Sequence, residues 1–139
     1  MREIRGSFVL VISAILAACV APAPPDVTGA GSQLAIREAE TREYDTLDKA
    51  MTMRSVISTL QDLGFVIDSA DLTLGTVTAT RLDKYTMRMT VTVREKGVKK
   101  IAVRANARIG EENVSNPATY QDFFSDLDKA MFLTLNKVD

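Results

Sequence analysis

The sequence predicts an α+β domain, in which two amphipathic helices pack on one face of an antiparallel sheet of four to five strands. The expected order of elements is β-α-β-β-β-β-α. Apolar residues recur at helical spacing in two segments, at 47–63 and 117–135. Between them, apolar and polar residues alternate along several runs, as they do in strands that bury one face. The apolar faces of both helices need a sheet to cover them, which favours this packing.

The N-terminal part of the domain is predicted to contain an edge strand and the first helix. Residues 35–44 are charged and alternate weakly, so we expect the edge strand there. Asp45 and Thr46 are residue types that begin helices. Gly64 stands where a helix ends on a left-handed residue, and Phe65 follows as the apolar contact of a Schellman motif. The apolar face of this helix comprises Ala50, Met53, Val56, Ile57, Leu60 and Leu63.

The rest of the sheet is predicted from four further segments. Residues 65–67 form a short buried strand, which ends in a turn at 68–71. Three longer runs, at 74–81, 85–94 and 101–109, alternate between apolar and polar side chains. A short glycine-containing segment joins the last two runs, which predicts a hairpin.

The second helix is predicted to begin after Asn116, which can cap it, with Pro117 in the first turn. Methionines of both helices and of the strands fall mostly on predicted core faces, so we expect them to fill gaps in the core rather than to bind copper. The apolar stripe of the second helix comprises Tyr120, Phe123, Phe124, Leu127 and Met131.

Residues 1–18 have the layout of a secretory signal peptide. Arg2 and Arg5 precede an apolar run at 8–16, which is too short to span a bilayer comfortably. Small residues follow this run up to Cys19. We therefore expect export from the cytoplasm and no transmembrane helix in the mature chain.

The segment Leu16-Ala17-Ala18-Cys19 resembles a bacterial lipobox. The resemblance implies cleavage between Ala18 and Cys19 and lipidation of Cys19, with palmitate-like acyl chains that anchor the protein stably. Val20 follows the cysteine, whereas an aspartate at that place favours retention at the inner membrane of Gram-negative bacteria. The resemblance thus implies an outer-membrane lipoprotein with its domain in the periplasm. The alternative is an ordinary cleaved signal, in which Cys19 has no special role.

Residues 19–32 are predicted to comprise the lipidated cysteine and a flexible linker. Prolines are concentrated at the start of this segment and glycines at its end, and apolar periodicity is absent from its sequence. A single domain at 33–139 follows, which is long enough to bury one core without a disulfide.

The order of elements, together with Leu63-Gly64-Phe65 between the first helix and a strand, resembles the helix-grip domains of outer-membrane assembly lipoproteins such as BamC. Segments 45–48 and 60–65 also resemble a family of small bacterial lipoproteins. These resemblances imply a location and a fold, and no activity. Because helix-grip folds can hold a small apolar or lipid ligand between the last helix and the sheet, a ligand binder is an alternative. The large side chains of the second helix predict that this space is filled instead.

Positive charge is concentrated in the predicted strands. Residues 81–108 contain nine Lys/Arg and two Asp/Glu, whereas the rest of the mature chain contains six and fifteen. A hairpin that pairs Val91 with Val103 and Thr90 with Arg104 turns five of these cations to the face opposite the helices. We expect this candidate docking face to comprise Arg88, Arg94, Lys100, Arg104 and Arg108.

Two interpretations of this face remain open. Either it is a solvated surface, which resists edge pairing or is neutralised by Glu38, Glu40 and Glu43 of the first strand, or it docks an acidic partner. Such a partner would be an envelope protein, anionic lipid headgroups or a cell-wall polymer. We do not expect nucleic acid, because the compartment excludes it and no aromatic side chain lies among the cations.

The composition argues against catalytic and metal chemistry. The chain has no His and one Cys, which excludes His-based acid/base catalysis, a Cys/His metal site and an internal disulfide. The carboxylate pairs Asp68/Asp71 and Glu111/Glu112 could hydrolyse a glycoside if they were suitably spaced, but turn formation and solvation account for them. We therefore expect a protein that is not an enzyme and uses no cofactor or metal.

These observations predict a lipid-anchored, non-catalytic binding module that serves an envelope assembly or transport complex. Its expected partners are the membrane, through the lipid, and an envelope protein, and its oligomeric state stays open. A helix-grip ligand binder is the alternative. A cell-wall hydrolase would require two close carboxylates in a cleft.

Overall fold

The computed structural model describes residues 27–136 of the 139-residue chain, with side chains from Gln33 onward. It confirms the predicted α+β class. The predictions for the signal peptide, for Ala18 and Cys19, and for the first part of the linker lie outside the described residues. The elements are α1 (Val27–Ala39), β1 (Thr41–Tyr44), α2 (Lys49–Asp62), β2 (Val66–Asp71), β3 (Thr76–Leu82), β4 (Thr86–Lys96), β5 (Lys100–Ile109), β6 (Glu112–Asn113) and α3 (Pro117–Leu135).

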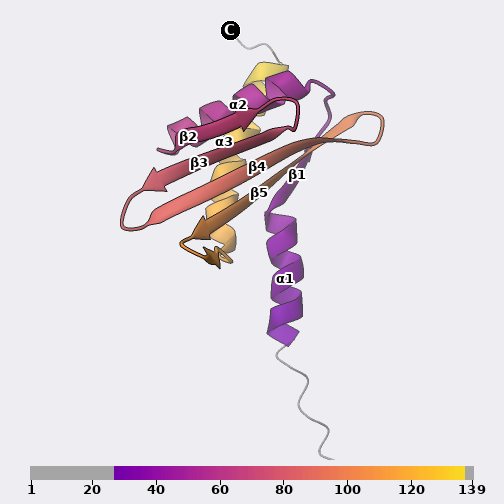
Figure 1. The fold of residues 1–139 in the computed structure, drawn as a ribbon. Coiled ribbons are helices and arrows are strands. Elements are labelled where there is room, and N and C mark those ends of the chain that lie inside the picture. Colours follow the sequence, from indigo (N-terminus) through magenta and orange to yellow (C-terminus); the bar gives the residue numbers. More distant parts are fainter. Residues whose placement is uncertain (1–26, 137–139) are drawn as a thin grey trace, which may run out of the picture.

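One antiparallel sheet organises the domain. Its strands lie in the order β1-β5-β4-β3-β2, and the two-residue β6 also pairs with β5. Helices α2 and α3 cover one face, whereas α1 projects beyond the sheet beside β1 (Figure 1). We call the helix-covered side the inner sheet face and the opposite side the outer sheet face.

Helix α2 begins later than predicted, at Lys49. The cap is Asp48 rather than Asp45 or Thr46, because its carboxylate accepts a 2.8 Å hydrogen bond from the Met51 backbone amide. The end of the helix agrees with the prediction. Gly64 has a φ of 81°, and the backbone amide of Phe65 donates to the Leu60 carbonyl at 2.9 Å, as in a Schellman motif.

Helix α3 has the predicted bounds. The Asn116 side chain caps it by accepting a 3.0 Å hydrogen bond from the Ala118 amide, and Pro117 occupies the first turn. All five members of the predicted apolar stripe are buried against the sheet and α2: Tyr120, Phe123, Phe124, Leu127 and Met131.

The prediction for the N-terminal part of the domain was largely wrong. Residues 35–39 belong to helix α1, and only Thr41–Tyr44 of the predicted 35–44 strand pair with β5. The helix also includes residues 27–32, which were predicted to be linker. Straight-chain and alanine residues after Gln33 favour a helix over the weak alternation, and Arg37 in the last turn complements the helix dipole.

The predicted turn at 68–71 was also wrong, because these residues belong to β2. A β-bulge between Ile67 and Ser69 lets the strand continue. The turn lies at residues 72–75, where Gly75 has a φ of 70° and its carbonyl accepts a 2.7 Å hydrogen bond from the Val93 amide. A Cβ atom on Gly75 would lie 2.2 Å from the Val93 carbonyl oxygen, so the close approach of the two backbones requires glycine.

The β4–β5 hairpin has the predicted faces but a different register. Val93, not Val91, lies opposite Val103, and Thr92, not Thr90, lies opposite Arg104. The loop is centred one residue later than predicted, so each pairing moves by two residues. A shift of two keeps every side chain on its predicted face.

The core lies between the inner sheet face and the two covering helices. Its strand contribution comes from alternate residues, all of them nearly inaccessible: Val77, Ala79, Met87, Met89, Val91, Val93, Ile101, Val103, Ala105 and Ala107. Tyr85, the first residue of the strand predicted at 85–94, is 58% exposed because β4 begins after it. The strand alternation therefore decides which side chains remain available on the outer sheet face.

Candidate docking face

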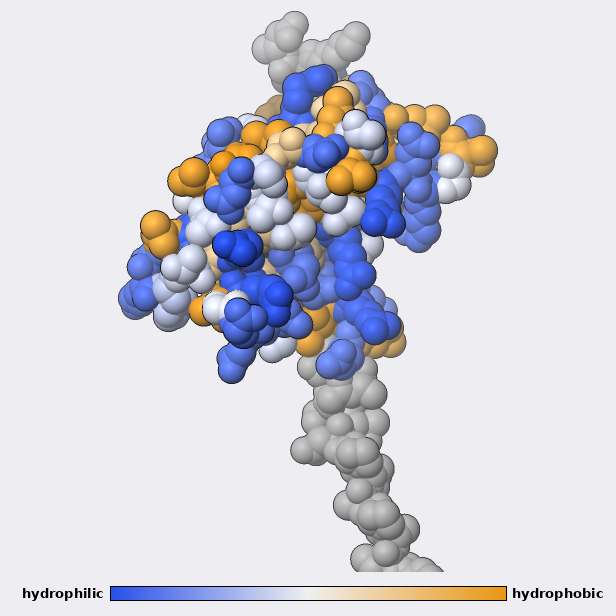
Figure 2. All heavy atoms as spheres, viewed as in Figure 1, coloured by the Kyte–Doolittle hydropathy of each residue, from blue (hydrophilic) through white to orange (hydrophobic). Residues whose placement is uncertain are grey.

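The outer sheet face carries all five predicted docking residues. Arg88 and Arg94 project from β4, and Lys100, Arg104 and Arg108 project from β5, each exposed. Between and beside them lie hydroxyl side chains of β3 and β4. Figure 2, which views this side of the molecule, shows hydrophilic and neutral residues over its middle and hydrophobic patches around its margins. The threonines that alternate with the buried positions are Thr76, Thr78, Thr80, Thr86, Thr90 and Thr92.

Two hollows indent this face. The first, which we call the Arg88 hollow, has a volume of about 570 Å³ and is lined by Arg88, Arg108, three threonines and the start of the β5–β6 turn. In its wall, Arg88 and Arg108 lie directly opposite each other on neighbouring strands. The predicted register placed Asn106 opposite Arg88, so this pairing of two cations differs from the prediction.

The second, the Arg94 hollow, has a volume of about 340 Å³ and is lined by Arg94, Arg104, Ala102, Thr92 and Thr41. Arg94 lies opposite Ala102, one diagonal step from Arg104. Each hollow therefore combines two guanidinium groups with threonine hydroxyls.

Acidic residues beside β1 neutralise part of the face. Glu40 is 6% exposed and accepts a 3.1 Å bond from Arg104. Glu43 forms ion pairs with Lys96 and, at 3.6 Å, with Lys100. The hydrogen bond from Lys96 lowers the pKa of the Glu43 carboxyl below its ordinary value. Two of the three glutamates considered from the sequence thus act on this face, although Glu40 lies in the turn before β1 rather than in a strand.

The remaining arginines keep their charge available. Among the described residues, neither Arg88 nor Arg94 forms an ion pair. Arg108 donates to the Glu111 backbone carbonyl at 3.0 Å, and its contact with the fully exposed Glu111 carboxylate is long, at 3.9 Å. Neutralisation is therefore greatest at the β1 side of the face and least at Arg88 and Arg94.

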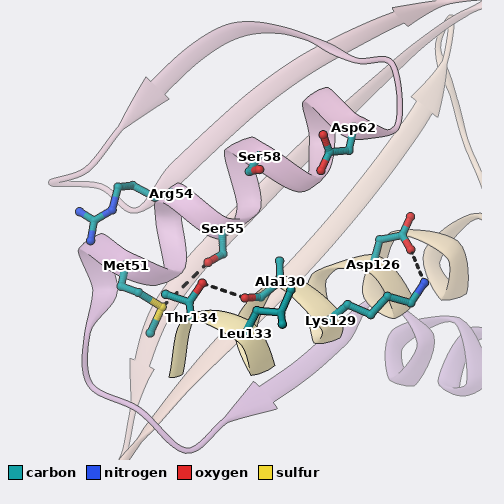
Figure 3. A pocket seen from close by; sticks show the side chains of 10 residues that line it. All are labelled: Met51, Arg54, Ser55, Ser58, Asp62, Asp126, Lys129, Ala130, Leu133 and Thr134. Atoms are coloured by element: carbon teal, nitrogen blue, oxygen red, sulfur yellow. Dashed lines mark hydrogen bonds and ion pairs between the residues drawn. The ribbon is translucent and has the colours of Figure 1, made fainter. Parts of the chain in front are cut away.

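A second surface feature lies on the opposite side of the molecule, between α2 and α3. This helix groove has a volume of about 620 Å³ (Figure 3). Met51, Ala130 and Leu133 give it apolar walls, and an Asp126–Lys129 ion pair of 2.8 Å lies along one side. Sequence patterns do not predict this groove, because it depends on how two separate helices are placed side by side.

The space between α3 and the sheet is filled. Tyr120 is fully buried; its hydroxyl donates to the Val114 carbonyl at 2.6 Å and accepts from the Ala107 amide at 3.2 Å. Phe123 and Phe124 are also fully buried and contact each other edge to face, with ring centroids 5.0 Å apart. A hollow that borders both α3 and the inner sheet face measures only about 100 Å³.

The carboxylates considered for catalysis take part in local hydrogen bonds or face solvent. Asp68 accepts a 2.6 Å bond from the Thr80 hydroxyl, and Asp71 accepts a 2.8 Å bond from the Leu74 amide. Glu111 and Glu112 are exposed. Over residues 27–136, no cluster of three or more potential metal ligands occurs.

Comparisons with known proteins give no family for this chain. A scan of protein families finds no match, and a search of the curated proteins finds no similar sequence. Within the described part of the chain, no helix combines the length and the apolar character needed to cross a membrane.

Proposed function

We propose that this protein is an outer-membrane lipoprotein whose periplasmic domain docks an acidic envelope protein through the outer sheet face. In this proposal Cys19 carries the lipid, and the segment after it tethers the domain. The domain acts by binding, as an accessory to an envelope assembly or transport complex, and catalyses no reaction. Tethering raises the local concentration of the domain near membrane-associated partners.

The pairing of Arg88 with Arg108 is the observation that carries the docking proposal. Like charges directly opposite each other on neighbouring strands destabilise a sheet, and threonine fills most other outward positions of β3 and β4 without that cost. An acidic partner would convert this repulsion into attraction. Solvation alone gives no reason for placing two arginines opposite each other.

The filled core weighs against the alternative of a helix-grip ligand binder. A small apolar or lipid ligand would have to displace side chains of α3 that are fully buried, such as Phe123 and Phe124. Among the described residues, the larger hollows lie outside this space.

The lipid anchor is tested by mass spectrometry of the native protein. We expect a mature chain that begins at Cys19 and carries acyl chains on it. Cys19→Ser should leave the protein unprocessed or released from the membrane fraction. A free, unmodified sulfhydryl at Cys19, or an unchanged membrane fraction of the variant, would refute the anchor.

Docking is tested by crosslinking in intact cells. The double variant Arg88→Glu/Arg94→Glu reverses two charges that have no described ion pair, and Arg54→Glu makes the same change on α2 as a control. We expect the double variant to lose the crosslinked adduct of the wild type and the control to keep it. Melting temperatures of all three proteins show whether the fold is intact. Equal adducts from all three would exclude docking through this face, and loss in Arg54→Glu alone would point to the helix groove.

A further inference from the structure

The two hollows of the outer sheet face have the chemistry of carboxylate sites. A guanidinium group presents its donors in a planar fork that matches the two oxygens of a carboxylate. In the Arg88 hollow, Arg108 is held by the Glu111 carbonyl, so Arg88 remains free to bind an incoming anion. In the Arg94 hollow, Arg104 is held by Glu40, and Arg94 is free in the same way.

The spacing of the hollows suits an extended chain. Arg88 and Arg94 project from the same strand, six residues apart, and an even separation keeps both on one face. Six residues of a strand span about 20 Å, at about 3.4 Å per residue. An extended peptide that runs along β4 would therefore reach both hollows with side chains that are also six residues apart.

The floor between the hollows is polar and uncharged. Thr90 lies opposite Asn106 there, and Thr92 continues the row toward Arg94. Within the described part of the chain, no apolar or aromatic side chain projects outward between the two arginines. A membrane surface gains from apolar side chains inserted beside the cations. This floor offers none, because the exposed Val66 and Leu82 lie at the β2–β3 margin of the face. Hydroxyl and amide groups instead suit the polar backbone of a peptide.

We propose that the outer sheet face binds one extended acidic segment of a partner protein, with a carboxylate in each hollow and six residues from one carboxylate to the next. This inference rests on the proposed docking function and specifies the chemistry of the partner. Uncharged residues of the segment lie over Thr90, Thr92 and Asn106. The hollows thus act together, and a segment that fills only one of them binds more weakly.

The experiment uses the native lipidated protein in detergent and three fluorescent peptides. One has glutamates at positions 1 and 7 separated by serines, a second has the two glutamates adjacent, and a third has glutamine in place of both. We expect anisotropy titrations to show binding of the spaced peptide about tenfold tighter than binding of the adjacent peptide, because one further charge-assisted contact is made. The glutamine peptide should not bind.

Substitutions of the two arginines show which of them contact the peptide. Arg88→Gln and Arg94→Gln should each weaken binding of the spaced peptide about tenfold, to the level of the adjacent peptide, whereas Arg54→Gln on α2 should leave it unchanged. Unchanged melting temperatures show that the variants fold. Competition experiments measure how well glutarate and glycerol phosphate displace the spaced peptide. Glutarate presents carboxylates, and glycerol phosphate mimics a lipid headgroup, so the two compare the affinity of the face for carboxylate and for phosphate.

Three results would overturn the inference. They are equal affinity for the spaced and adjacent peptides, an equal loss in Arg54→Gln, and far stronger competition by glycerol phosphate than by glutarate, which would indicate a lipid surface. If crosslinking in cells still depends on Arg88 and Arg94 in these cases, docking stands and only the extended-segment inference fails. If crosslinking does not depend on them, the proposed function itself fails.

Discussion

The two faces of the sheet are built from the same strands but differ in what holds their side chains. On the inner face of β4, every residue from Met87 to Val93 that points inward is at most 8% exposed. On the outer face, the alternate residues are threonines and arginines, and Arg88 and Arg94 have no ion pair with a described residue. Packing constrains the inner face tightly, so its residues report on the fold. In the described part of the chain, helices α2 and α3 do not cover the outer face, so core packing does not determine its charge pattern.

The largest contrast between the faces should come from deleting a side chain that covers the inner one. Phe123→Ala removes a fully buried ring and should lower the free energy of unfolding by about 4 kcal/mol. Thr90→Ala on the outer face should lower it by about 1 kcal/mol at most, through lost strand propensity. Chemical denaturation measures both. Similar losses from the two variants would contradict the division between the faces.

A substitution at Gly75 tests whether the close approach of the β2–β3 turn to β4 contributes to stability. Gly75→Ala combines a left-handed backbone with a 2.2 Å approach to the Val93 carbonyl oxygen, so we expect a loss of about 3 kcal/mol. Gly97→Ala is a matched control, since its φ is 64° but nothing lies within 4 Å of the added Cβ atom. Thermal unfolding should show a loss of only about 1 kcal/mol for the control. If both variants lost the same amount, the close approach would have no energetic role.

Within the outer face, Arg104 should matter for stability because its partner is buried. Arg104→Glu would place a second carboxylate beside Glu40, which is 6% exposed, and should cost about 2 kcal/mol. The half-exposed position of Arg104 keeps this below the cost of breaking a fully buried pair. Denaturant midpoints at low and high salt measure the effect. A variant as stable as the wild type would show that the Glu40–Arg104 pair contributes nothing.

The same substitution at Arg88 should raise the stability of the fold rather than lower it. Arg88→Glu replaces two facing cations by a cross-strand ion pair with Arg108, so we expect a gain of about 0.5 kcal/mol. The same denaturation experiment, with Arg54→Glu for comparison, measures it. A loss of stability would show that Arg88 has a structural partner and would weaken the docking proposal.

The smallest effect should come from losing the ion pair between Lys96 and Glu43. Lys96 holds the pKa of this carboxyl below its ordinary value of 4.5, so the pair stabilises the fold at neutral pH and loses its effect as the pH falls through the lowered pKa. Lys96→Gln should move the pKa of Glu43 back toward 4.5, as followed by NMR. An unchanged titration would mean that Lys96 does not hold Glu43 in solution.

The sequence predicted the elements whose signals are local. Asn116 and Pro117 set the start of α3, Gly64 set the end of α2, and the period of two assigned the β4 and β5 side chains to their faces. The failures depend on tertiary structure. The bulge after Ile67 lets β2 run through a segment that reads as a turn.

The candidate site was predicted in its members but not in its geometry. Parity along the strands was enough to place five cations on one face. The exact register was needed to bring Arg88 opposite Arg108 and to form the two hollows. Local propensities do not settle a shift of two residues, since it leaves the inner face unchanged.

Helix α1 gives the domain a stalk. Its 13 residues, at a rise of about 1.5 Å each, separate Val27 from the sheet edge by about 20 Å. A coil of the same length would sample many shorter end-to-end distances, whereas a helix keeps its two ends at a fixed separation. In the proposed function, this helix would add its length to the tether between Cys19 and the arginine-bearing side of the domain.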